Sequence, residues 1–430
     1  MARRLDGSLG TCSPSMGGSS PLRKSGHMRS KAIRVCAGLI AISTLAACGG
    51  GKNESADSGH GIPSGPIVIG MPIALTGPIN AYDGNTLTGV RLAADEINTK
   101  GGIKGHKIKV ITADTASNIA QGTAAAQDVV NEGAQFLVPT IDYNYGRAAA
   151  RIGAKRGLIV LGAADDTRFG KSLGDNVFNL GTGGPTQGAA LAEYAYTTLK
   201  WRKAYVLQDT GLAAQKATCE VGFSGAFRAH GGRVTKDSFQ QASESAVVSA
   251  VSRVKAAAAK VDGVMLCGYP PQGATAIRKL RAAGVTAPLL LSTGFDGNFW
   301  TPAVPDLRKT YSISFAAVTP GQAKDPEAAK AFKAAEKADK PVTQSLAFLT
   351  GYSAVQTIVD AVEATNSTSA EKIRPYLEAY KNHKLAIGRT TWTGECHARA
   401  GGQMVIARFV KGTERHAATV TPSKLPQRVC

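Results

Sequence analysis

Short apolar runs alternate with amphipathic segments along most of the chain after residue 66. Runs such as Ile67–Ile69 and Leu289–Leu291 predict strands, because they are short and bounded by polar residues. Between the runs, apolar residues recur at helical spacing, as they do from Leu87 to Ile97. The pattern predicts strands at 67–69, 107–112, 136–138, 158–161, 205–207, 264–266 and 289–291, and helices at 119–132, 185–199, 247–258 and 274–283.

This alternation of strand and helix restarts after Gly181 and therefore forms two sets. Alternating strand–helix units predict parallel sheets flanked by helices, and two sets predict two lobes. The length also favours two lobes, because about 360 residues follow position 66 and a single hydrophobic core stops growing near 250 to 300 residues. We expect an α/β protein with two lobes.

The N-terminal region has the features of an export signal. Arg29, Lys31 and Arg34 precede an apolar run at 35–47, which is shorter than the roughly 20 residues that a membrane-spanning helix needs. The run ends in Leu45-Ala46-Ala47-Cys48, which resembles the bacterial lipobox. That resemblance implies that Cys48 is diacylated and becomes the mature N-terminus; the alternative is an ordinary signal peptide with a chance cysteine.

The signal also divides the N-terminal residues into segments. Met28 lies directly before it, so we interpret 1–27 as an upstream misassigned start and 28–47 as a lipoprotein signal peptide. Residues 48–65 are rich in Gly and Ser and lack periodicity, which predicts a flexible tether. The protein is therefore expected to be extracytoplasmic and lipid-anchored to the outer face of the cell membrane.

Charge argues against a nucleic-acid partner. The formal net charge is +19, and residues 1–47 carry seven Lys/Arg and one Asp, which leaves +13 for the remainder. The basic residues are interspersed singly, without an arginine-rich block or interleaved aromatic residues. A basic surface that faces an anionic membrane or wall polymer accounts for this charge.

Four of the seven cysteines remain once Cys12, Cys36 and Cys48 are set aside. An even set in an oxidising compartment favours two disulfides, and four cysteines allow three pairings. We favour Cys219 with Cys267 and Cys396 with Cys430, because each pair falls in one region of the chain. The dipeptide Cys396-His397 lacks a second ligand pair at zinc spacing, so we expect no metal site.

A series of short motifs carries a family resemblance over about residues 66–411. In chain order they are Leu75-Thr76-Gly77-Pro78, Tyr82, Thr88-Gly89-Val90, Asp95-Glu96-Ile97-Asn98, Gly101-Gly102-Ile103-Lys104-Gly105, Asp209, Gly268-Tyr269, Leu280-Arg281-Ala282-Ala283-Gly284, Gly351-Tyr352-Ser353-Ala354, Gly388 and Thr391-Trp392. Their order and spacing resemble type I periplasmic binding proteins of the branched-chain amino acid group. That group comprises leucine/isoleucine/valine-binding protein-like lipoproteins, which are substrate-binding components of ABC importers.

The resemblance implies two Rossmann-like lobes arranged as a Venus flytrap, with the ligand in the cleft between them. Three hinge crossovers would join the lobes near 181–184, 316–320 and 387–391. The implied division is 66–181 and 320–387 for lobe 1, 182–316 and 391–420 for lobe 2, and 421–430 as a C-terminal tail.

The resemblance also implies a set of ligand-binding residues at strand ends: Tyr82, Asp142, Tyr143, Asn144, Ala164, Asp165, Tyr269 and Asp296. Tyr143 and Asn144 stand where relatives have small serines, and Asp165 replaces a threonine. Such a site disfavours a bare carboxylate and suits a cation or a hydroxyl-rich ligand. Asp142 and Asp165 have an alternative role as helix caps or solvated loop residues.

We therefore expect a monomeric solute-binding protein that captures a small polar solute, such as an amino acid, an amide or a related compound, and delivers it to the permease subunits of an ABC transporter. A second hypothesis is a sensory or regulatory lipoprotein of the same fold. A third, weaker one is an exported enzyme, but the sequence contains no Ser/His/Asp set, metal cluster or phosphate loop. We expect no catalytic residue and no cofactor.

Overall fold

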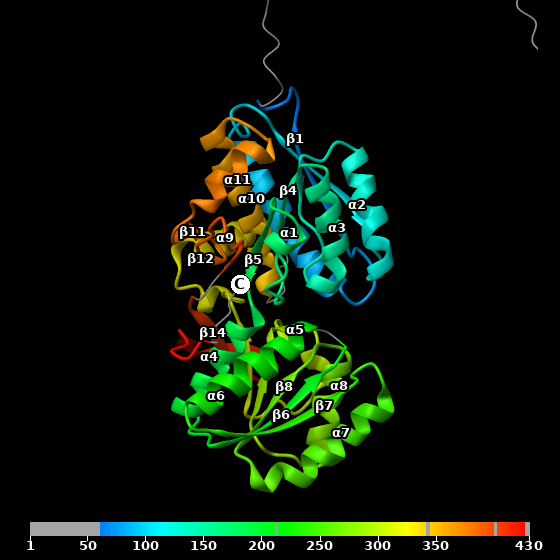
Figure 1. Cartoon of the computed structure of the whole chain (residues 1–430), viewed down its shortest axis with the longest axis vertical. Helices are drawn as coiled ribbons and strands as arrows, with labels where there is room; N and C mark the ends of the chain where they lie inside the picture. The colour runs from blue at the N-terminus through cyan, green and yellow to red at the C-terminus, as the bar shows by residue number, and fades with distance from the viewer. Residues whose placement is uncertain (1–60, 212, 341–344, 400–401, 426–430) are drawn as a thin grey trace, which may run out of the picture. The chain divides into compact units, whose positions relative to one another are not determined.

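Two β-sheets, each flanked by helices, make up the part of the chain that this computed structural model describes, residues 61–425 apart from 212, 341–344 and 400–401 (Figure 1). The first sheet has the strand order β13-β5-β4-β3-β1-β2, and the second has the order β15-β14-β10-β9-β8-β6-β7. Each sheet with its helices is called a lobe below. The predicted α/β class with two lobes is confirmed.

The first lobe contains a parallel sheet. Its strands are β1 (Ile67–Ile73), β2 (Ile108–Asp114), β3 (Phe136–Leu137), β4 (Ile159–Gly162), β5 (Val177–Thr182) and β13 (Ala398–Arg399). Its helices are α1 (Asn80–Thr99), α2 (Gly122–Asn131), α3 (Tyr143–Lys155), α9 (Pro326–Lys337), α10 (Leu346–Thr365) and α11 (Ala370–Glu378). Helices α2 and α3 cover one face of the sheet and α10 and α11 the other, with a small hairpin of β11 (His383–Leu385) and β12 (Gly388–Thr390) beside α9 (Figure 1).

The second lobe contains a mixed sheet. Strands β6 (Lys203–Asp209), β7 (Arg233–Phe239), β8 (Gly263–Cys267), β9 (Leu289–Leu291) and β10 (Thr310–Ser314) are parallel. Strands β14 (Met404–Val410) and β15 (Thr413–Val420) add an antiparallel edge, which the expectation of purely parallel sheets missed. The helices are α4 (Gly184–Thr197), α5 (Ala213–Lys216), a π-helix at Ala217–Ser224, α6 (Gly225–Ala229), α7 (Glu244–Ala257) and α8 (Gln272–Ala282).

Two glycines allow α1 and α10 to cross in close contact behind the first sheet. A methyl group added to Gly351 would lie 1.9 Å from the carbonyl oxygen of Thr86, and one added to Gly89 would lie 2.1 Å from that of Phe348. Both distances are far inside van der Waals contact, so only glycine fits at this crossing. The crossing holds α1 and α10 against each other, and the first turns of both helices border the site described below.

The chain passes between the sheets three times. It leaves the first sheet after β5, returns after β10, and leaves again between β13 and β14. Residues 391–399, which the sequence analysis assigned to lobe 2, belong instead to lobe 1: β13 pairs with β5, and the Trp392 indole donates a hydrogen bond to the Asn179 carbonyl oxygen at 3.2 Å. The expected crossover at 387–391 is therefore wrong, because buried aromatic packing of Trp392 on Phe178 keeps this segment on the first sheet.

One predicted disulfide is present in the second lobe. Cys219 in the π-helix and Cys267 at the end of β8 are bonded, with their Cα atoms 6.0 Å apart, which confirms this pairing. Cys396 is also disulfide-bonded. Its expected partner, Cys430, lies outside the described residues, so that pairing stays a prediction.

Replacing both Cys219 and Cys267 with alanine should lower the free energy of unfolding by about 2 to 5 kcal/mol, because the bond closes a loop between residues 48 positions apart in sequence. Urea unfolding followed by circular dichroism measures the loss. Reduction of the wild-type protein should produce at least as large a loss, because it also breaks the disulfide of Cys396. Equal urea midpoints for the double variant and the unreduced wild type would show that the bond contributes nothing.

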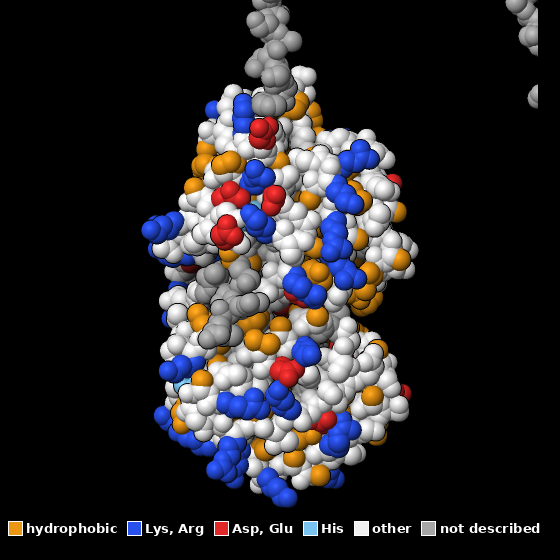
Figure 2. Space-filling view, viewed as in Figure 1, with side chains coloured by type: hydrophobic (Ala, Val, Ile, Leu, Met, Phe, Trp, Pro, Cys, Tyr) orange, Lys and Arg blue, Asp and Glu red, His pale blue; other side chains and the backbone are white. Residues whose placement is uncertain are grey.

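The arrangement of charge and the lengths of the helices bear on how the protein meets its surroundings. On the face that Figure 2 shows, basic side chains are spread over both lobes. Within the described ranges, the helices are all too short or too polar to cross a bilayer. Residues 1–60 lie outside the described part of the chain. They hold the lipobox, the signal peptide and most of the tether, together with Cys12, Cys36 and Cys48.

Candidate functional site: a cavity between the lobes

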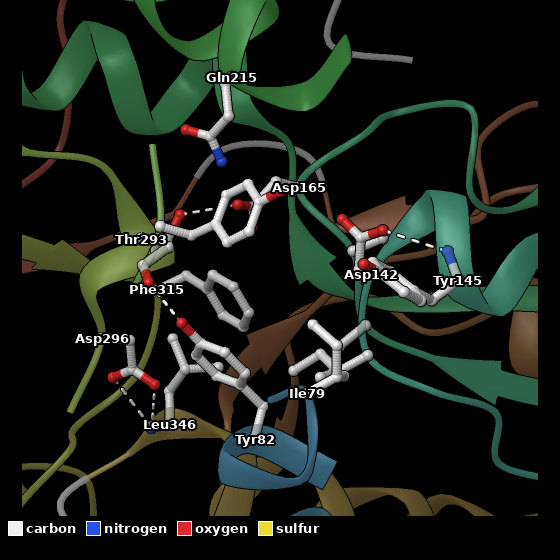
Figure 3. Close-up of a pocket in the computed structure, with 15 residues that line it drawn as sticks. Ile79, Tyr82, Asp142, Tyr145, Asp165, Gln215, Thr293, Asp296, Phe315 and Leu346 are labelled. Atoms are coloured by element: carbon white, nitrogen blue, oxygen red, sulfur yellow. Dashed lines mark hydrogen bonds between the residues drawn. The ribbon is translucent and has the colours of Figure 1, made fainter. Parts of the chain in front are cut away.

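Both lobes contribute side chains to a cavity of about 90 Å³ (Figure 3). The first lobe supplies the loops after β1, β3 and β4 and the start of α10, and the second lobe supplies the residues after β6, β8, β9 and β10. Parallel α/β sheets bind ligands at these carboxyl ends of their strands. The lining residues are Ile79, Tyr82, Ile141, Asp142, Tyr145, Ala163, Ala164, Asp165, Gln215, Tyr269, Thr293, Gly294, Asp296, Phe315 and Leu346.

Asp83 holds two of these loops in place from behind the cavity. Its carboxylate accepts hydrogen bonds from the backbone N–H of Ala74 at 2.7 Å and from that of Ile141 at 2.9 Å. The side chain is fully buried, and burial raises its pKa to about 7. Asp83 thus joins the loop after β1 to the loop after β3. The sequence analysis missed this role, because an acidic residue in the first turn of a helix is common.

Asp142 both caps a helix and lines the cavity. Its Oδ1 accepts hydrogen bonds from the backbone N–H groups of Asn144 at 2.7 Å and Tyr145 at 3.2 Å, which makes it the N-cap of α3. Its φ is 129°, a value that side-chain-bearing residues rarely adopt and that concentrates at functional sites. Burial raises its pKa to about 6. The two roles proposed for Asp142 from sequence are therefore compatible.

Asp165 joins the two lobes through a small polar network. It accepts a hydrogen bond from Gln187 Nε2 at 2.9 Å and another from the Thr293 hydroxyl at 2.9 Å. Gln187 begins the second lobe, and Thr293 follows β9, so a first-lobe carboxylate is held by second-lobe donors. Burial raises the pKa of Asp165, although both hydrogen bonds oppose this.

Two further contacts join the lobes through the same short segment, 293–296. The Tyr82 hydroxyl donates a hydrogen bond to the Gly294 carbonyl oxygen at 2.6 Å. Asp296 accepts one from the Ser345 hydroxyl at 2.6 Å and another from the Leu346 N–H at 3.0 Å, at the start of α10 (Figure 3). Burial raises the pKa of Asp296 to about 7. Ligand pockets commonly exceed roughly 300 Å³, so a solute of ordinary size fits here only if these contacts rearrange.

Six of the eight residues expected at the site line the cavity: Tyr82, Asp142, Ala164, Asp165, Tyr269 and Asp296. The other two, Tyr143 and Asn144, do not line it. The Tyr143 side chain is buried in the core beside α3, with the Arg168 guanidinium 4.4 Å from its ring centre. Asn144 instead contributes its backbone N–H to the cap made by Asp142.

The sequence analysis overlooked Tyr145, Gln215, Thr293 and Phe315. Thr293 lies two residues after β9 and Phe315 directly follows β10, so the rule that ligands meet strand ends could have found both. Tyr145 lies within the first turn of α3. Gln215 lies on the short helix α5, which has too few residues to give a periodic pattern of apolar positions.

The cavity is acidic and aromatic. Asp142, Asp165 and Asp296 line it together with the rings of Tyr82, Tyr145, Tyr269 and Phe315, and no Lys, Arg or His is among the lining residues. Two like charges 4 Å apart repel by about 4 kcal/mol at the effective dielectric constant of a protein surface, so a ligand carboxylate is disfavoured. Among the residues of the described part, no group of His, Cys, Asp and Glu side chains could hold a metal ion.

Two lobes that enclose a polar cavity at their strand ends define a solute-binding protein. A family model described as periplasmic binding protein matches residues 66–414. The chain belongs to this family, in the type I branched-chain amino acid group. It is a substrate-binding protein of the ABC-transporter type rather than an enzyme.

Several proteins of this group resemble the chain. It is 27% identical over 337 residues to the Leu/Ile/Val-binding protein BraC3 of Rhizobium johnstonii, which covers 76% of this chain and 87% of BraC3. The leucine-binding protein LivK of Thermotoga maritima shares the fold with a TM-score of 0.73 at 22% identity, over 83% of this chain and 99% of LivK. LivJ of Streptococcus pneumoniae, solved with isoleucine, gives 0.72 at 21% identity, over 83% of this chain and 100% of LivJ.

Proposed function

We propose that this protein captures a small polar solute in the cavity between its lobes and delivers it to the permease of an ABC importer. The observation that carries the proposal is the shared lining: Asp142 and Asp165 come from one lobe, and Tyr269 and Asp296 from the other. A solute that contacts both lobes stabilises the closed arrangement by its higher affinity for that state. The relatives named for leucine, isoleucine and valine support an amino acid, an amide or a related compound as the solute.

The same proposal includes movement of the lobes. The segment 293–296 forms hydrogen bonds to Asp165, Tyr82 and the start of α10, and these bonds must break for the cavity to open. The bonds are few and polar, so a bound solute that replaces them can decide between the open and closed states. The three passages of the chain between the sheets are the natural hinges.

We further propose that Cys48 carries a lipid that anchors the protein, as a monomer, to the outer face of the cell membrane. The motif Leu45-Ala46-Ala47-Cys48 supports this, and the Gly- and Ser-rich residues that follow provide a tether. The four residues lie outside the described part of the chain.

Replacing Cys48 with alanine should move the expressed protein from the detergent phase to the aqueous phase in a Triton X-114 partition and leave its precursor uncleaved at this site. The folded domain is untouched, so thermal stability should not change. Unchanged partitioning of the variant would contradict lipid attachment at Cys48.

A sensory lipoprotein of the same fold remains the alternative, since the same cleft could report solute binding to a partner protein. Transport distinguishes the two. Deleting the gene should abolish uptake of the radiolabelled co-purified solute into cells if the protein serves an importer, and uptake should return with the wild-type gene. Normal uptake by the deletion strain would favour the sensory role.

A further inference from the structure

The helix terminus that could bind a ligand carboxylate is occupied by the protein itself. The N–H groups of Asn144 and Tyr145 lie in the first turn of α3, next to the cavity-lining Asp142, and lack partners within the helix, so they would suit an anion. Instead, Oδ1 of Asp142 accepts hydrogen bonds from both, and Figure 3 shows the one from Tyr145. An internal carboxylate thus takes the place that a ligand carboxylate would otherwise fill, and it adds negative charge to the wall.

Within the described part of the chain, the acidic side chains that line the cavity have no positively charged partner. There, Asp165 and Asp296 accept hydrogen bonds from neutral groups, namely Gln187, Thr293, Ser345 and the Leu346 N–H. None of the described hydrogen bonds reaches Oδ2 of Asp142. The neighbouring acid Asp166 differs, because it is paired with Arg168 at 2.6 Å and does not line the cavity. Asp296 is buried and Asp142 and Asp165 are partly buried. Carboxylates withdrawn from water in this way, without a counter-charge, favour a cationic ligand.

The remaining lining side chains fit the rest of such a ligand. Tyr82, Tyr145, Tyr269 and Phe315 offer ring faces and edges, which attract organic cations and cover hydrocarbon. Gln215 is only 4% exposed, and its Oε1 accepts a hydrogen bond from the Ser292 hydroxyl at 2.8 Å. None of the described hydrogen bonds uses its Nε2, which points into the cavity in Figure 3. That donor suits a neutral acceptor on the ligand, such as a hydroxyl or carbonyl oxygen.

We propose that the captured solute is a small organic cation without a carboxylate group, an amine, amidinium or guanidinium compound. Its charge lies against Asp142 and Asp165, and its less polar part contacts the aromatic side chains. This inference rests on the proposed function, because it assigns the class of solute to the same cavity.

Four probes with one hydrocarbon skeleton separate the charge classes: isopentylamine, 4-methylpentanoate, 4-methylpentanamide and leucine. They carry, in that order, a cation alone, an anion alone, no charge, and both charges. Isothermal calorimetry at pH 7.5 should give isopentylamine a dissociation constant at least about tenfold lower than that of leucine, and no measurable binding of 4-methylpentanoate at about 10 mM. Tighter binding of leucine or 4-methylpentanoate, or no binding of isopentylamine at about 10 mM, would overturn the proposal.

The Asp142→Asn variant removes the charge but keeps the fold, because asparagine is also a preferred N-cap residue. It should weaken isopentylamine binding at least about tenfold and reduce the preference for isopentylamine over 4-methylpentanamide. An unchanged preference would show that Asp142 does not bind the cation. A carboxylate-bearing solute that co-purifies and closes the lobes would overturn this inference while leaving the proposed function intact, whereas failure of every charge class to compact the lobes would overturn the proposed function.

Discussion

Replacing Asp165 with asparagine should weaken binding of the co-purified solute by about 30-fold to about 4,000-fold, which corresponds to about 2 to 5 kcal/mol. The substitution removes a charge that no cationic side chain among the described residues balances. It keeps one oxygen for the hydrogen bond from Thr293 but loses the bond from Gln187 Nε2. A neutral hydrogen bond contributes only about 1 kcal/mol, so most of the expected loss reports the pairing of this charge with a cationic solute. Isothermal calorimetry on the two purified proteins measures it.

Asp166→Asn is the matched control for this variant. Asp166 is the next residue in sequence and is buried, whereas Asp165 is partly buried; Asp166 pairs with Arg168 and does not line the cavity. Its substitution should leave the solute's dissociation constant within about twofold of the wild-type value. Equal effects of the two substitutions would show that the Asp165 charge has no special part in binding.

Replacing Gly351 with alanine should lower the free energy of unfolding by about 3 kcal/mol or more. The added methyl group would lie 1.9 Å from the Thr86 carbonyl oxygen and 3.0 Å from the Val90 nitrogen, so α10 and α1 would have to move apart. These contacts are with backbone atoms, which cannot rotate away as a side chain can. Urea unfolding followed by circular dichroism measures the effect.

Gly84→Ala tests the same change on α1 without the clash. A methyl group there would lie 3.5 Å from Asn80 Nδ2, an ordinary contact. Alanine is favoured over glycine inside a helix by about 1 kcal/mol, so this variant should be as stable as the wild type or slightly more so. If Gly351→Ala were equally stable, the close crossing of the two helices would not be a constraint on the fold.

The sequence predicts the parallel part of the fold because each central strand is a short apolar run. Leu289–Leu291, for example, was expected as a strand and forms β9 with those bounds, and the run at Ile67 begins β1. Such runs are buried on both faces by helices, so their residues are apolar throughout and stand out from the amphipathic helices between them.

The edges of the sheets could not be predicted in the same way. Strand β13 has only two residues, Ala398 and Arg399, and its position depends on contacts of Trp392 and His397 with β5 that lie far apart in sequence. Strand β15 is largely polar, because one of its faces is open to solvent. Short or half-exposed strands leave no apolar run, and the third passage between the lobes was therefore misplaced.

The candidate site also has residues that could be predicted from the sequence and residues that could not. The family resemblance implied Asp142 and Asp165, which lie in the loops after predicted strands, and both line the cavity. Tyr143 does not line the cavity: α3 begins at this residue and turns its side chain into the core, whereas Tyr145, two positions later, lines the cavity. The roles of Asp83 and Thr293 depend on contacts between distant segments, which one sequence does not reveal.

Small-angle X-ray scattering on the purified protein, titrated with its co-purified solute after that solute has been removed, tests most directly whether the cavity closes on a solute. The contacts made by residues 293–296 hold the two lobes together around the cavity. The radius of gyration should be larger without the solute and should fall, saturably, as solute is added, with the same midpoint as calorimetric binding. Saturable binding with an unchanged radius of gyration would contradict the account.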